Sequence, residues 1–148
     1  MERLQMNILV SACFLGMGCR YDGTGYLLEE LNLLKEKHTL IPICPEIYGG
    51  LQTPRDPAEI LNDRVITKKG QDVTSEFHKG ANEIIKLARF YQCTHAILKE
   101  RSPSCGHGKI YDGTFTGTLI NGNGVAADLL SKEGIHILGE SEINSLLK

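Results

Sequence analysis

The sequence predicts an α/β fold of the doubly wound, Rossmann-like type, with three layers and a mainly parallel sheet, in a single domain over residues 1–148. Four short aliphatic runs recur along the chain, and helical hydrophobic patterns fill the gaps between them. A length of 148 residues suits one domain, and 41% apolar with 23% charged residues is a globular composition.

The aliphatic runs predict the strands. Short continuous runs of this kind are typical of strands buried on both faces, as in parallel sheets. Because parallel strands need helical crossovers, the expected order is βαβαβαβ with helices on both faces. The runs lie at residues 8–10, 40–43, 96–98 and 135–138.

Amphipathic patterns predict the helices between these runs. Asp72 or Thr74 is the expected cap of the second helix, and the third should start near residues 121–123 and end at Gly134, a usual position for glycine. The helical patterns lie at residues 27–34, 77–88, 121–134 and 141–147.

Two stretches interrupt this alternation. Residues 47–73 are long for a connection between a strand and a helix, and such loops are usually functional or disordered. A small hairpin is expected within them, over residues 64–73. Residues 106–120 form a glycine-rich insertion in which residues 111–114 have the composition of a turn.

Charge and hydropathy exclude several classes of partner. Lys and Arg total 16 against 18 Asp and Glu, so a net charge of −2 favours neither DNA nor an anionic membrane. No apolar run approaches the roughly 18 residues of a membrane span. Residues 1–3 carry no net positive charge, and the apolar run before Cys13 is too short for a secretion signal. We therefore expect a cytoplasmic protein with reduced thiols.

The five cysteines are the most informative residues. Their number is odd and no Cys-x-x-Cys pair is present, which argues against a zinc ribbon or a thioredoxin-type pair. Cys13, Cys44 and Cys105 follow the first three predicted strands, so they should meet at the carboxyl edge of the sheet, where such folds bind ligands. Three thiolates suit zinc, copper(I) or an iron–sulfur cluster and leave one metal position open. The alternative is that they are small buried apolar residues.

The remaining cysteines and the histidines are expected to differ from these three. Cys19 is a candidate fourth ligand, whereas Cys93 lies at the opposite edge of the predicted sheet and should be a packed thiol. No two of the five histidines have metal-ligand spacing. His38 is expected at the surface, and only His107 lies near the predicted site.

Three polar residues are expected beside the predicted cleft. Glu46 follows the second predicted strand and is a candidate general acid or base, or a cap of a helix or loop. Ser102 and Ser104 precede the third candidate thiol, where they would relay protons or cap a turn.

Two further features are candidate anion sites. Arg55, in a proline-bounded loop, would hold a carboxylate or phosphate, or pair at the surface with Asp56 or Glu59. Residues 122–124 open a predicted helix, whose first N–H groups would bind an anion or simply be capped.

Several strings of residues together resemble a known family. They are SACFLG at 11–16, CRYDG at 19–23, CPE at 44–46, GGL at 49–51, TPR at 53–55, KERSPSCG at 99–106 and IYDGTF at 110–115. The set spans essentially the whole chain. It resembles a bacterial family long known as a domain of unknown function, whose characterised members are thiouracil desulfidases.

The resemblance implies a 4Fe–4S cluster held by three cysteines, which match Cys13, Cys44 and Cys105, with Cys19 outside this set. The fourth iron would bind the sulfur of a thiopyrimidine base, nucleoside or nucleotide, which is then removed by hydrolysis. The family's proton-handling Glu and Ser match Glu46 and Ser102.

Arg55 and Ser104, which lie near the predicted cleft, are expected to bind the substrate. Longer family members carry a second domain, whose contacts would here be absent or come from the second subunit of a homodimer.

Two alternatives stay open. A non-catalytic metal- or sulfide-binding module, such as a sulfur carrier, would bind metal without turnover. A thiol redox enzyme using Cys13 and Cys19 would form a reversible disulfide without iron, although their spacing differs from the usual Cys-x-x-Cys.

Overall fold

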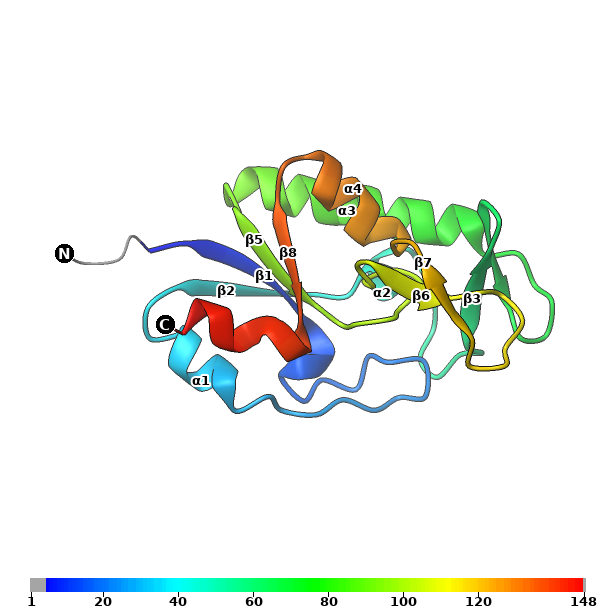
Figure 1. Cartoon of the computed structure of the whole chain (residues 1–148), viewed down its shortest axis with the longest axis horizontal. Coiled ribbons are helices and arrows are strands. Elements are labelled where there is room, and N and C mark those ends of the chain that lie inside the picture. Colours follow the sequence, from blue (N-terminus) through cyan, green and yellow to red (C-terminus); the bar gives the residue numbers. More distant parts are fainter. Residues whose placement is uncertain (1–4, 148) are drawn as a thin grey trace.

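A parallel four-stranded sheet forms the middle layer of the protein (Figure 1), as the aliphatic runs predict. The computed structural model describes residues 5–147, so residues 1–3, used above to argue against a secretion signal, lie outside it. The strand order is β2-β1-β5-β8. The strands are β1 Asn7–Ser11, β2 Thr39–Ile43, β5 His95–Leu98 and β8 His136–Gly139.

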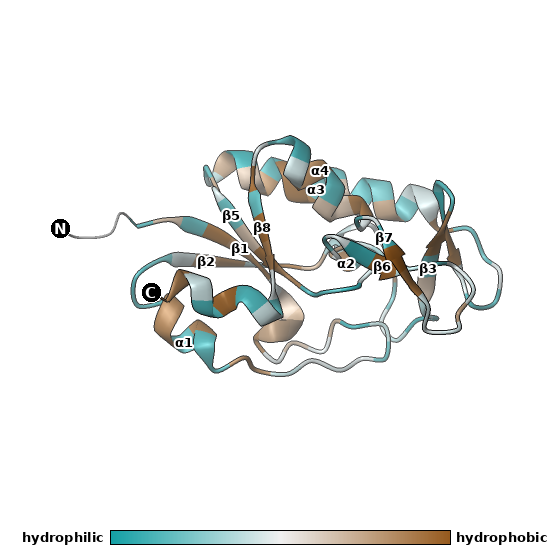
Figure 2. Ribbon diagram, viewed as in Figure 1, coloured by the Kyte–Doolittle hydropathy of each residue, from teal (hydrophilic) through white to brown (hydrophobic). Residues whose placement is uncertain are grey.

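Successive side chains of the central strand β1 enter two different cores. Ile8 and Val10 pack into one hydrophobic cluster and Leu9 into another, and all three are 0% exposed. The central strand β1 is therefore hydrophobic on both faces, whereas α3 alternates hydrophobic and hydrophilic residues along its length (Figure 2).

Helices cover both faces of the sheet (Figure 1). The helices α3 (Thr74–Phe90) and α4 (Val125–Lys132) lie on one face. The helix α1 (Glu30–Leu34) and the 3-10 helix η2 (Glu140–Leu146) lie on the other. The predicted three-layer α/β architecture is therefore confirmed.

Several helix boundaries differ from those expected. Helix α1 begins only at Glu30, because Leu27 is engaged in a bridge with Leu15. Helix α4 begins at Val125 because Gly124 is extended, with φ −63° and ψ 161°. The last helix is a 3-10 helix that starts at Glu140.

One of the two predicted helix signals is confirmed. Gly134 follows α4 with φ +86°, a conformation that glycine adopts readily. The expected cap of α3 was wrong, because the N-cap position is Val73 and no side chain caps the helix. Asp72 instead accepts the N–H of Thr74 at 2.9 Å in the turn that leads into α3.

Two antiparallel hairpins extend beyond the carboxyl edge of the sheet. One pairs β3 (Ala58–Leu61) with β4 (Arg64–Thr67), and the other pairs β6 (Lys109–Tyr111) with β7 (Leu119–Asn121). The expected hairpin over 64–73 is present as a short pairing, with an antiparallel bridge between Ile66 and Asp72 and a backbone bond from the Val73 N–H to the Val65 carbonyl oxygen at 2.9 Å. The longer pairing of β4, with β3, was not expected. A two-residue turn begins at Asn62, which has a φ of 58°, so β4 folds back onto the preceding strand.

None of the helices in residues 5–147 is long and apolar enough to cross a membrane.

Candidate functional site

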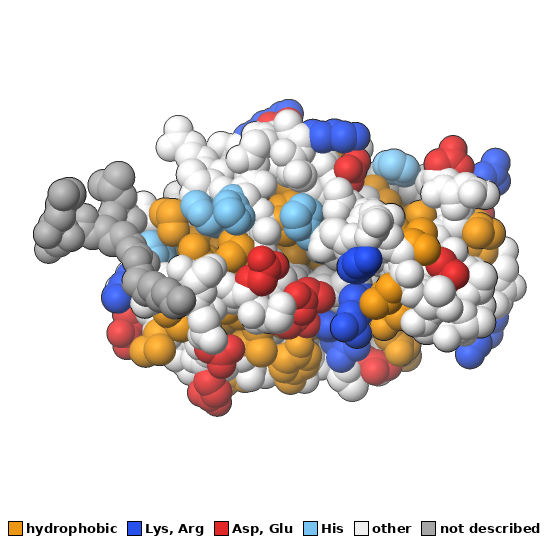
Figure 3. All heavy atoms as spheres, viewed as in Figure 1, with side chains coloured by type: hydrophobic (Ala, Val, Ile, Leu, Met, Phe, Trp, Pro, Cys, Tyr) orange, Lys and Arg blue, Asp and Glu red, His pale blue; other side chains and the backbone are white. Residues whose placement is uncertain are grey.

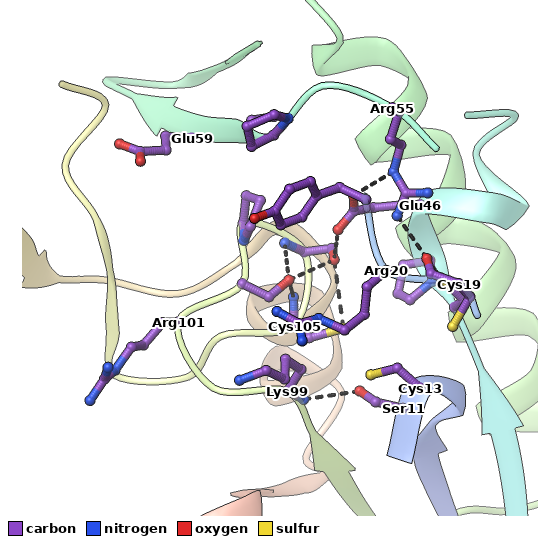
Figure 4. Close-up of a pocket in the computed structure, with 18 of the residues that line it drawn as sticks. Ser11, Cys13, Cys19, Arg20, Glu46, Arg55, Glu59, Lys99, Arg101 and Cys105 are labelled. Atoms are coloured by element: carbon purple, nitrogen blue, oxygen red, sulfur yellow. Dashed lines mark hydrogen bonds and ion pairs between the residues drawn. The ribbon is translucent and has the colours of Figure 1, made fainter. Parts of the chain in front are cut away.

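A cavity of about 450 Å³ opens at the carboxyl edge of the sheet (Figure 4). The ends of β1, β2 and β5 form its floor, and residues from the two hairpins line the opposite wall. Lys and Arg side chains gather on the molecular surface between the sheet and the hairpins (Figure 3). The basic residues that line the cavity are Arg20, Arg55, Lys68, Lys99 and Arg101.

Three cysteines reach the cavity from three adjacent strands. Cys13 lies in the 3-10 helix η1 (Ala12–Phe14) after β1, Cys44 directly follows β2, and Cys105 lies in the loop after β5. The chain leaves β1 towards β2 and leaves β5 towards β8, so β1 and β5 flank the topological switch point. Ligands bind at such points in open α/β sheets.

A fourth thiol lies in the same cavity. Cys19 lines it and is 7% exposed. Its thiol hydrogen-bonds Cys13, and its carbonyl oxygen accepts the Cys44 thiol at a sulfur–oxygen distance of 3.8 Å. Cys93, in contrast, is half-buried and packs against the core beneath α3 and α4.

The cavity thiols differ in how readily they ionise. The hydrogen bond from Cys19 lowers the pKa of Cys13 below its usual 9.0. A hydrogen bond with Cys19 is the main cause that raises the pKa of Cys44, and burial adds to it. Burial raises the pKa of Cys105 to about 12. Cys13 is therefore the favoured thiolate of this set, and metal binding would release protons from the others.

The donor set fits an iron–sulfur cluster. All five cysteines are free thiols. Within residues 5–147, no three or more His, Cys, Asp or Glu side chains are grouped closely enough to share one metal ion. A cluster takes one thiolate on each iron it binds through the protein, so its ligands need not converge on a single point.

Glu46 is held at the cavity by two donors. It belongs to α2 (Pro45–Tyr48), which begins directly after Cys44. Its Oε1 accepts Arg55 Nε at 3.1 Å and its Oε2 accepts the Ser104 hydroxyl at 2.8 Å (Figure 4). The side chains of Arg55 and Glu46 are 10% and 16% exposed, so this ion pair is largely removed from solvent.

The ion pair changes the interpretation of Arg55. The expected surface partners were wrong, because Asp56 pairs with Lys69, and Glu59 accepts two backbone N–H groups. The Arg55 guanidinium also donates to the carbonyl oxygens of Gln52 and Cys19 and to the Thr53 hydroxyl. In this structure, Arg55 therefore fixes the positions of Glu46 and of the loop residues that its guanidinium contacts.

Two serines connect Glu46 to the third cysteine. Ser102 Oγ accepts the backbone N–H groups of Ser104 and Cys105, both at 3.1 Å. It lies 3.0 Å from Ser104 Oγ. Each serine thus bonds within the 102–105 turn, which agrees with the expectation that these residues cap a turn. Both serines also line the cavity.

Glycines allow the close packing that places these residues. A Cβ on Gly80 of α3 would lie 1.9 Å from the Pro45 carbonyl oxygen, and one on Gly49 would lie 2.0 Å from the Glu76 carbonyl oxygen. Helix α2 therefore packs backbone to backbone on α3 and carries Glu46 to a defined position.

The start of α4 holds the serine loop. The backbone N–H groups of Val125, Ala126 and Ala127 donate to the carbonyl oxygens of Pro103 and Ser104 at 2.8–3.0 Å. Because these N–H groups already bond to the protein, the start of α4 does not provide the anion site considered at residues 122–124. These N–H groups fix the loop that carries the serines.

Further cavity residues lie inside the quoted sequence motifs but were not identified from them. They include Tyr21, Tyr111 and Phe115. The position of the 112–118 loop depends on hairpin packing, since Glu59 accepts the N–H groups of Gly113 and Phe115 at 3.0 Å and holds this loop over the cavity.

The histidines His38 and His107 do not contribute to the cavity. His107 is exposed and does not line the cavity. His38 is buried rather than at the surface, where it was expected.

Comparisons with known proteins agree with this arrangement. A solved structure described as the 4Fe–4S-dependent thiouracil desulfidase TudS is 40% identical, with a TM-score of 0.89 over 97% of this chain and 96% of that chain. The uncharacterized protein YbbK of Bacillus subtilis (strain 168) is 40% identical over 150 residues, covering 95% of this chain and 99% of that protein. The family model described as 2-thiouracil desulfurase matches residues 8–142, and the chain therefore belongs to that family.

Proposed function

We propose that this protein is an iron–sulfur-dependent desulfidase acting on thiouracil- or thiouridine-type pyrimidines. The reaction is hydrolytic: the C=S group and water give a C=O group and hydrogen sulfide. One observation carries the proposal, namely that three thiols from adjacent strands and the half-buried carboxylate of Glu46 line the same cavity. Family membership and the similarity to TudS support it.

Cys13, Cys44 and Cys105 would hold the cluster, and Cys19 remains a neighbouring thiol. When bound with three protein ligands, a 4Fe–4S cluster supplies an open iron with affinity for soft sulfur, which polarises a C=S carbon. Free thiols fit a reducing, cytoplasmic setting, which we propose for this protein.

Glu46 and Ser102 would handle protons. Glu46 would accept a proton from the attacking water, because its carboxylate lines the cavity and is held in place by Arg55. Ser102 would orient that water through its hydroxyl. Tyr21, Tyr111 and Phe115 offer apolar surface to a flat pyrimidine.

Anaerobic reconstitution tests the proposal. We expect roughly four irons per chain, as the cluster type requires, and sulfide release from at least one substrate in a panel of 2-thio and 4-thio bases, nucleosides and nucleotides. Cys13→Ala should lose iron and activity, while Cys93→Ala, the matched control outside the cavity, should keep both.

Two results would contradict the proposal. Bound iron without turnover of any thiopyrimidine would favour a carrier or sulfide-binding module. Full cluster binding by Cys13→Ala would show that the ligand assignment is wrong.

A further inference from the structure

Phe115 lines the cavity in a backbone conformation that bulky residues rarely adopt. Its φ is 58°, in the left-handed region that favours glycine. A conformation of this kind is strained and persists only where the surrounding structure holds it, and such residues cluster at ligand sites. Phe115 is partly buried, whereas Thr114 and Thr116 on either side of it are exposed. The loop at residues 112–118 therefore keeps one aromatic side chain at the cavity wall.

Glu59, from the other hairpin, holds this loop. Its Oε1 accepts the backbone N–H groups of Gly113 and Phe115, both at 3.0 Å. Hydrogen bonds to a carboxylate are stronger than those between neutral groups, so one side chain can fix this turn. The N–H of Thr114, which lies between the two, donates to Asp112 Oδ1 at 3.0 Å. Three successive N–H groups of the loop therefore bond to carboxylates, and two of them bond to Glu59.

The loop also packs closely on β3, the strand that carries Glu59. Gly113 has a φ of +95°, and a Cβ at this position would lie 2.9 Å from Leu61 Cβ and 3.0 Å from the Ile60 carbonyl oxygen. The loop backbone therefore touches β3 beside the hydrogen bonds to Glu59. This packing and the Glu59 carboxylate together set where Phe115 lies in the cavity wall.

A planar ring suits the wall that Phe115 forms. The thiols lie on the cavity floor and the hairpins on the opposite wall, so a thiopyrimidine with its sulfur at the thiols extends its ring towards the hairpins. An aromatic side chain stacks on the flat π face of a pyrimidine, and this contact contributes to binding. A dihydropyrimidine has lost the ring double bond and is puckered, so it cannot stack in the same way.

We propose that Phe115 is a specificity-determining residue that stacks on the substrate ring and selects planar thiopyrimidines over their ring-saturated dihydro analogues. Glu59 is the positioning residue that holds Phe115 for this contact. The inference rests on the proposed function and adds to it which rings the cavity accepts. Neither residue handles a proton or holds the cluster in that function, so substrate binding should change while the chemical step does not.

Kinetics of the reconstituted protein test the stacking contact. The two measured quantities are the KM of thiouracil, or of the thiopyrimidine turned over fastest, and the competitive inhibition constant of its dihydro analogue, which requires no turnover. Phe115→Leu should raise the KM roughly 10-fold, in the lower part of the range for a lost base–aromatic stack, with little change in kcat. The inhibition constant should hardly change. Phe115→Tyr, which keeps an aromatic ring, should retain the wild-type KM.

Variants of Glu59 test its positioning role. Glu59→Ala should raise the same KM, while Glu59→Gln, which keeps an oxygen acceptor, should restore most of the wild-type value. Because Glu59 acts through Phe115, the Glu59→Ala/Phe115→Leu double variant should lose no more than the worse single variant. Ile120→Ala is the matched control, since Ile120 is an exposed residue of the same hairpin outside the cavity. Its KM should equal that of the wild type.

Amide hydrogen exchange of the cluster-free protein gives a readout without turnover. Exchange over residues 112–118 should be faster in Glu59→Ala than in the wild type, because two of the loop's hydrogen bonds are lost. Phe115→Leu keeps both bonds and should exchange like the wild type. Unchanged exchange in Glu59→Ala would contradict the positioning role.

The remaining outcomes separate stacking, positioning and the proposed function. An unchanged KM in Phe115→Leu, or an equal rise in the KM and the inhibition constant, would overturn the selection of planar rings. A raised KM in Phe115→Leu with an unchanged KM in Glu59→Ala would overturn only the role of Glu59. A wild-type protein that releases no sulfide from any thiopyrimidine overturns the proposed function itself.

Discussion

At the scale of single residues, the hydrogen bond from the Cys19 thiol determines which cavity cysteine ionises first. It stabilises the Cys13 thiolate and lowers the pKa of Cys13. Cys19→Ala should therefore move the first thiolate titration step of the cluster-free protein to higher pH, as followed by ultraviolet absorbance. Cys93→Ala should leave that step in place, and an unmoved step in Cys19→Ala would show that another group stabilises Cys13.

The site residues differ in how far the sequence could assign them. Cys13, Cys44 and Cys105 could be assigned to one cavity, because each follows an aliphatic run and parallel strands end at a common edge. The partners of Glu46 could not, since Arg55 is 9 positions away and Ser104 is 58 positions away. Such contacts depend on how loops pack, which residue spacing does not encode.

At the scale of elements, the contact between α2 and α3 positions Glu46, and Gly80 makes it possible. Alanine usually stabilises a helix interior by about 1 kcal/mol relative to glycine. Here the new Cβ would lie 1.9 Å from the Pro45 carbonyl oxygen, a backbone atom that moves only if the helices separate. Gly80→Ala should therefore destabilise the fold by roughly 1–3 kcal/mol in denaturant unfolding.

The neighbouring exposed residue supplies the control for this element. Lys79→Ala lies on the same helix and should change the free energy of unfolding by less than about 0.5 kcal/mol. A stabilised Gly80→Ala would mean that α2 moves freely on α3. The glycine itself was unremarkable in the sequence, because a close approach between two backbones becomes visible only once α2 and α3 are in place.

At the scale of the whole molecule, the length of the sheet separates the cavity from a pair of histidines at the opposite edge. The cavity lies at the carboxyl edge, while His95 and His136 begin two paired strands at the amino edge. Their rings stack with centroids 5.3 Å apart. The four strands could be predicted because they are continuous aliphatic runs, but this pairing of histidines required the strand order.

This arrangement predicts how stability depends on pH. Desolvation, and then the nearby His136 and His38, lower the pKa of His95 below 6.5. The folded state therefore binds its proton less tightly than the unfolded state does. The stability contributed by neutral His95 should be full above about pH 6.5 and decline as the pH falls through that value towards the lower folded-state pKa. His95→Gln should show a smaller fall in Tm between pH 7.5 and 5.5 than the wild type, whereas His107→Gln, at an exposed position, should match the wild type. An equal fall in His95→Gln and wild type would place the acid sensitivity elsewhere in the molecule.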